Sequence, residues 1–208
     1  RQFYNAFKYE DRIKVERVPK ATSSTLIKIY ETIIKKDANW IFDELISKAK
    51  VYHTLIEAES FPATPLTGAL VDLERISASP SYTFLLYLFS LDKSALESEE
   101  ILLQTVQLLC KYYFRRNITD FPNTRDLDVI NINLIEQCQE QIKAKGKLDY
   151  LFIEQTLLTG KGKPAPVADL KESLKNNLFY NNVWMARYCL SKLDETSHTR
   201  EYKPDLWA

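Results

Sequence analysis

This sequence contains few glycines, and its positive and negative charges are equal in number. Only four of its 208 residues are glycine, at positions 68, 146, 160 and 162. Tight hairpins, phosphate-cradling loops and dinucleotide-binding turns all need glycine, so this scarcity argues against all three. The 28 lysines and arginines equal the 28 aspartates and glutamates in number. No whole-molecule field therefore attracts nucleic acid or a membrane surface, and any such contact must come from a local basic cluster.

Histidine, cysteine and long apolar runs are also sparse. His53 and His198 have no cysteine or carboxylate neighbours at metal-ligand spacing, so no metal site is expected. Three cysteines lie far apart among aliphatic residues, at positions 110, 138 and 189. That placement favours reduced, packed thiols over disulfides or nucleophiles. The longest apolar run, 82–91, is too short to span a bilayer. We therefore expect a cytoplasmic protein without a membrane partner.

Hydrophobic residues recur at three- and four-residue steps along most of the chain, which predicts helices. Residues 1–20 are the exception and predict a short helix or an irregular arm. The expected helices cover about 26–34, 40–56, 65–76, 81–91, 98–116, 127–138, 147–158, 168–176 and 181–194. The segment 81–91 is apolar on nearly all sides and is expected to be buried at the centre.

Several residues suit helix starts. Ser23 or Ser24, Asp37 and Thr124 are candidate N-caps, and Pro65 suits a first helical turn. The sequence shows no fixed-period repeat, which argues against a solenoid. We predict an all-α fold, an irregular bundle of about eight to ten helices. We expect a single α-helical domain over 1–208, or alternatively a division into 1–91 and 92–208.

The segment 112–130 (YYFRRNITDFPNTRDLDVI) carries the most informative charges. Arg115, Arg116 and Arg125 fall within eleven residues, on both sides of a proline-containing turn. If their side chains converge, they could bind phosphate oxygens of a nucleotide or of a DNA backbone, with Asn117 as a neutral donor.

A structural role for the same residues is the alternative. Arg115 and Arg116 would then stabilise a helix C-terminus, where cations complement the helix dipole. Arg125 and Asp126 would pair with the neighbouring carboxylates Asp120 and Asp128 and lock the turn without a ligand.

Residues 160–166 (GKGKPAP) resemble a phosphate-binding loop only superficially. No strand is expected before them, and the prolines cannot donate backbone amides. We interpret this segment as a flexible loop, and we assign no catalytic residue anywhere in the sequence.

Residues 113–127 (YFRRNITDFPNTRDL) resemble a recurrent sequence motif of GmrSD-type, modification-dependent (type IV) restriction endonucleases. Residues 170–182 and 186–194 are similar to that family's Tyr-Asn-Asn segment and to the helix after it. Pro-Asp-Leu-Trp at 204–207 resembles the residues before the family's Ile-Glu-His-Ile-x-Pro element. Residues 22–110 match only in helical pattern.

In that family, a ParB-like domain with an Asp-Gly-Gln-Gln-Arg motif handles nucleotide, and an HNH-type domain cuts modified phage DNA. This sequence contains neither motif. The resemblance implies that the chain is the helical middle part of a longer bacterial or archaeal protein used in phage defence. Its partners would be the neighbouring ParB-like and HNH domains and, as a further candidate, DNA; an oligomer is compatible.

The resemblance also bears on cofactors and binding residues. The parent protein would use a nucleoside triphosphate and a divalent metal, whereas this segment itself would hold no cofactor. Five residues become a candidate binding site for DNA phosphate, nucleotide or a neighbouring domain, namely Arg115, Arg116, Asn117, Arg125 and Asp126. The alternative function is a free-standing helical protein–protein interaction module.

Overall fold

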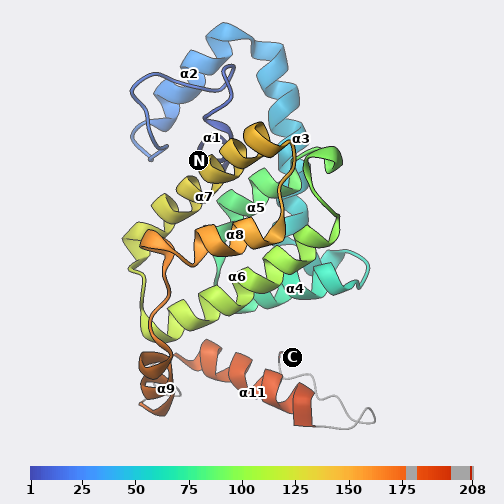
Figure 1. The fold of residues 1–208 in the computed structure, drawn as a ribbon. Helices are drawn as coiled ribbons and strands as arrows, with labels where there is room; N and C mark the ends of the chain where they lie inside the picture. The colour runs from blue at the N-terminus through green and yellow to red at the C-terminus, as the bar shows by residue number, and fades with distance from the viewer. Residues whose placement is uncertain (177–181, 198–206, 208) are drawn as a thin grey trace.

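The computed structural model describes residues 1–176, 182–197 and 207. Within these ranges it consists of α-helices joined by loops and short 3₁₀ turns, and the only extended pairing is one isolated bridge between Leu96 and Leu148 (Figure 1). The helices are α1 (Gln2–Phe7), α2 (Leu26–Lys36), α3 (Ala38–Ile56), α4 (Pro65–Arg75), α5 (Tyr82–Phe89), α6 (Glu100–Thr119), α7 (Thr124–Lys145), α8 (Tyr150–Leu157), α9 (Val167–Lys175) and α11 (Val183–Ser197). The predicted all-α bundle is confirmed.

Two predicted helix starts have the expected chemistry. The Asp37 carboxylate accepts a hydrogen bond from the Trp40 backbone N–H at 3.0 Å, which caps α3. Pro65 is the first residue of α4, behind a capping box in which Thr64 and Thr67 exchange side-chain-to-backbone hydrogen bonds. Both devices satisfy backbone groups that the first helical turn leaves unpaired.

Two other predicted caps are wrong. Neither Ser23 nor Ser24 caps α2, because Thr25 lies at the N-cap position and its hydroxyl accepts from the Thr22 backbone N–H at 2.9 Å. Thr124 is the first residue of α7 and does not cap it; Asn123 takes the cap position without a side-chain hydrogen bond. The Thr124 hydroxyl instead accepts a hydrogen bond from Arg116.

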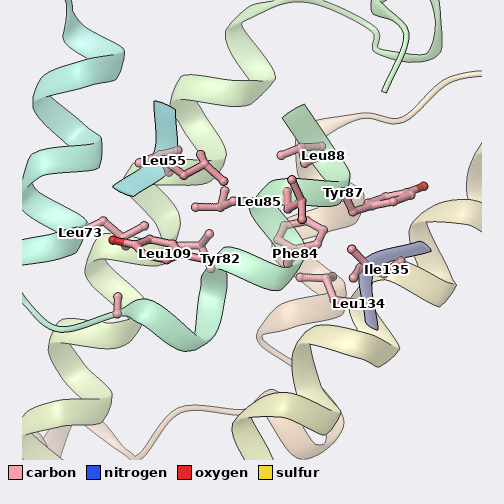
Figure 2. Packing of buried hydrophobic residues seen from close by; sticks show 14 of the residues in the cluster. Leu55, Leu73, Tyr82, Phe84, Leu85, Tyr87, Leu88, Leu109, Leu134 and Ile135 are labelled. Atoms are coloured by element: carbon pink, nitrogen blue, oxygen red, sulfur yellow. The ribbon is translucent and has the colours of Figure 1, made fainter. Parts of the chain in front are cut away.

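Helix α5 lies at the centre of the packed core, as its all-round apolar sequence predicts. Seven of its eight residues are buried, and it packs against α1, α3, α6 and α7. Figure 2 shows Phe84, Leu85 and Leu88 of α5 among side chains from α3, α6 and α7. Burial of this much apolar surface is the main favourable contribution to folding.

Helices from both sides of residue 91 share this core. Helix α4 packs on α6, and α1 and α5 pack on α7. Helix α6 also contacts α8, α9 and α11, and in Figure 1 α8 lies on one side of α6 while α9 and α11 lie on the other. Among the described helices, none is both long enough and apolar enough to cross a membrane.

Candidate functional site: the arginine turn and the adjacent groove

The arginine-bearing segment forms the turn between α6 and α7. Helix α6 runs through Arg115, Arg116 and Asn117 and ends at Thr119; Asp120 follows in the left-handed region at φ 52°. The Phe121–Pro122 peptide bond is cis, and α7 begins at Thr124. The chain therefore reverses within four residues, which brings the last turn of α6 next to the first turn of α7.

The Arg116 side chain spans this turn. Its Nε donates to the Pro122 carbonyl at 3.1 Å, and its Nη2 donates to the Thr124 hydroxyl at 2.6 Å. Its Nη1 donates to the Asn117 Oδ1 at 3.0 Å, and the Asp120 carboxylate lies 3.9 Å away. The side chain is only 12% exposed. Arg116 thus acts as a clamp, and its donors are used by the protein itself.

Asn117 ties the turn to a third helix. Its Nδ2 donates to the backbone carbonyl of Ile76, the C-cap residue of α4, at 2.5 Å. The same amide accepts from Arg116 through its oxygen. The Arg116–Asn117 pair therefore connects the ends of α4, α6 and α7 to each other.

Arg115 points to a different part of the molecule. Its Nη2 donates to the backbone carbonyl of Ala165, in the segment before α9. Its Nε is buried and has no hydrogen-bond partner among the described residues. Ala165 is itself buried, and Gly160–Gly162 just before it forms a 3₁₀ turn where we expected only a flexible loop. Arg115 therefore connects α6 to the segment that leads into α9.

Arg125 and Asp126 lie in the first turn of α7. Arg125 is exposed, and within the described ranges neither side chain makes a hydrogen bond or an ion pair. The expected pairing with Asp120 and Asp128 does not form, because Asp128 binds Lys20 at 2.7 Å and Asp120 lies near Arg116. Arg125 is the arginine of this segment whose donors are left available.

The three arginines therefore do not share one exposed surface. Arg116 and Asn117 are brought together, whereas Arg115 and Arg125 leave the turn in other directions. The sequence did not predict the acceptors of the hydrogen bonds that Arg115, Arg116 and Asn117 donate. Three of the acceptors are the backbone carbonyls of Ile76, Pro122 and Ala165, and a backbone carbonyl leaves no signature in the sequence.

A groove of about 610 Å³ lies beside Arg115, between α6, α9 and α11. Its lining is mostly apolar and contains no acidic side chain. The lining residues are Cys110, Lys111, Phe114, Arg115, Leu170, Leu174, Tyr188, Cys189, Leu190, Lys192, Leu193 and Thr196.

The two thiols that line the groove are not poised for chemistry. Burial raises the pKa of the Cys110 thiol to about 12, and the nearby Asp72 carboxylate adds to the shift. Burial likewise raises the pKa of Cys189, which is half-buried. Because the thiolate is the nucleophilic form, both cysteines are packing residues at neutral pH.

The structure also locates the histidine considered from the sequence. His53 is exposed, with its ring edge-on to Phe61 at 5.7 Å between ring centroids. His198 lies outside the described residues. Within the described ranges, no three histidine, cysteine or acidic side chains come close enough to hold a metal ion.

No known protein family, curated protein or solved structure matches this chain. The resemblance to GmrSD-type proteins therefore rests on the quoted motifs. Part of those motifs, residues 177–181 and 204–206, lies outside the described residues.

Proposed function

We propose that this chain is a helical connecting region of a GmrSD-type restriction endonuclease, between the nucleotide domain and the nuclease domain. In this role it couples the two neighbouring domains to each other and carries no catalytic group of its own. The nucleoside triphosphate and divalent metal would be bound by the neighbouring domains. The setting would be the cytoplasm of a bacterium or archaeon.

The observation that supports this proposal most is the structural role of residues 113–127, the motif that resembles the family. Its first half, Arg116 with Asn117, joins three helix ends through hydrogen bonds of 2.5–3.1 Å. Its second half presents Arg125 to solvent. A segment that fixes helix geometry and leaves one cation free suits a connecting region better than a catalytic centre.

The position of Arg125 is not explained by helix stability. A cation in the first turn of a helix faces the positive end of the helix dipole, which is unfavourable. Asp126 is its immediate neighbour, and adjacent helical residues do not face each other. We therefore propose that Arg125 contacts an anionic partner, and in this family context that partner is the DNA backbone.

Fluorescence anisotropy with labelled duplex DNA at several salt concentrations tests this contact. We expect salt-dependent binding that Arg125→Ala weakens, with a log–log salt slope reduced by about one. Removing an unfavourably placed cation should leave stability unchanged or slightly higher. Lys143→Ala, which removes an exposed cation near the other end of α7, is the matched control and should not weaken binding.

Absence of salt-dependent DNA binding by the wild type, or equal binding by Arg125→Ala, would remove DNA as the partner of this surface. The second candidate function, a free-standing helical protein–protein interaction module, would then be preferred. A specific observation favours that alternative: the apolar residues of α9 and α11 beside the groove remain exposed to solvent.

A further inference from the structure

The groove between α6, α9 and α11 has an apolar surface that the described residues do not cover. Helix α9 has no buried residue, although Val167, Leu170 and Leu174 lie on one face at helical spacing. On α11, Leu190 is 49% exposed and Leu193 is 62% exposed. Half of the exposed large hydrophobic side chains in the described ranges belong to these two helices, and three of them, Leu174, Leu190 and Leu193, line the groove.

The floor of the groove is well packed and preformed. The rings of Phe114 on α6 and Tyr188 on α11 lie 5.8 Å apart and hold the two helices together. Lys192, which also lines the groove, is held by ion pairs to Asp72 at 2.7 Å and to Glu195 at 3.0 Å. These contacts hold α11 against α4 and α6, whereas Leu174, Leu190 and Leu193 remain exposed.

The free charge at the groove has one sign. Lys192 is paired with the carboxylates of Asp72 and Glu195, so it offers no free positive charge. Lys111 is exposed, and neither Lys111 nor Arg115 has an ion pair among the described residues, although Arg115 donates a hydrogen bond to the Ala165 carbonyl. With no acidic residue in the lining, an occupant that carries negative charge is complementary to Lys111 and Arg115.

The openness of the walls favours a large occupant over a small one. A small-molecule site normally buries most of its ligand, whereas here Leu174, Leu190 and Leu193 are 36%, 49% and 62% exposed. A helix that lays its apolar face into a groove covers such walls with residues at i, i+3, i+4 and i+7. We propose that this groove binds the apolar face of an acidic amphipathic helix from another protein.

A fluorescein-labelled peptide of about 16 residues provides the probe, with leucines at i, i+3, i+4 and i+7 and glutamates on both flanks. A second peptide replaces the glutamates by lysines. We expect the acidic peptide to bind the full chain with a Kd below about 100 μM and the lysine peptide to bind at least about tenfold more weakly. Added salt should weaken the acidic peptide's binding.

Three variants locate the site. Leu193→Glu places a charge on the groove wall, and Lys111→Glu reverses the free cation; each should weaken acidic-peptide binding by about tenfold or more. Leu151→Glu on α8 is the matched control, because Leu151 is 61% exposed and lies outside the groove. It should bind as the wild type does. Lys111→Glu should also gain affinity for the lysine peptide.

Several results would overturn this proposal. The lysine peptide could bind the wild type as tightly as the acidic one, or Leu193→Glu could behave like Leu151→Glu. A fluorescent long-chain fatty acid could bind where the acidic peptide does not, which would indicate a small amphiphile. The proposal is independent of DNA contact, since Arg125→Ala should leave peptide binding unchanged.

Discussion

Arg115 and Arg116 are adjacent in sequence but serve different parts of the structure. Successive residues of an α-helix point roughly 100° apart, because a turn contains about 3.6 residues. Arg116 therefore turns toward α7, whereas Arg115 turns toward Ala165 and the groove. The sequence identified this segment as unusual, but the separation of its arginines depends on helix phase and on backbone acceptors contributed from elsewhere.

Replacing Arg116 should cost far more stability than replacing Arg125. Arg116→Ala removes three hydrogen bonds from a charged, mostly buried donor, and we expect the free energy of unfolding to fall by about 2–3 kcal/mol. Arg125→Ala should change it by less than about 0.5 kcal/mol. Urea unfolding followed by circular dichroism measures both. Equal losses in the two variants would contradict the division of roles.

Cys110 should make stability fall at alkaline pH. Burial raises the pKa of its thiol to about 12, from 9.0, so the unfolded chain loses the proton first. The contribution to stability is complete below pH 9 and is lost as the pH rises toward 12. At pH values between these limits the loss approaches about 1.4 kcal/mol per pH unit.

Comparing wild type with Cys110→Ala by urea unfolding from pH 7 to pH 10 tests this. The variant should lose stability less steeply above pH 9, although burial also raises the pKa of Tyr82 and of Tyr112 to about 12. If the free energy of unfolding falls with pH at the same rate in the two proteins, Cys110 ionises normally in the folded state.

At the scale of the helices, hydrophobic periodicity was the reliable signal. It located every segment that forms a described helix from α2 onward, because burial of one face requires a 3.6-residue repeat. Cap residues were less predictable. Asp37 caps its helix, whereas Ser23 and Ser24 do not cap α2, since several polar residues stand before that helix and only tertiary packing selects among them.

The cap of α3 should be worth about 1 kcal/mol. Asp37→Ala removes the acceptor for the Trp40 backbone N–H and should lower the free energy of unfolding by about that amount. Asp43→Ala, which removes an exposed carboxylate of the same helix away from its start, is the control. If both substitutions have equal effects, general charge accounts for the loss and capping does not.

At the scale of the whole molecule, the pattern of helix contacts was not predictable. The apolar sequence of α5 predicted its central place, but nothing in it predicted that α1, α3, α6 and α7 would surround it. The groove between α6, α9 and α11 could not be predicted from the sequence either. Leucines at helical spacing in α9 look the same in the sequence whether another helix covers them or solvent does.

We expect the chain to unfold as one cooperative unit, because the core crosses residue 91. Far-UV circular dichroism and tryptophan fluorescence, which reports from Trp40 in α3, Trp184 in α11 and Trp207, should give coincident transitions. Two separate transitions would instead favour a division into 1–91 and 92–208.

The centre of that unit is Phe84, which is fully buried. Phe84→Ala should lower the free energy of unfolding by about 3–5 kcal/mol and shift both signals together. Phe42→Ala is the matched control on the exposed surface of α3, and it should change stability by less than about 0.5 kcal/mol. A loss confined to one of the two signals would argue against a shared core.

Sequencing the coding region on either side of this segment tests whether these helices connect a nucleotide domain to a nuclease domain. We expect an Asp-Gly-Gln-Gln-Arg motif upstream and an Ile-Glu-His-Ile-x-Pro element downstream in the same reading frame. A reading frame that contains neither motif would contradict the connecting role and favour a free-standing helical interaction module.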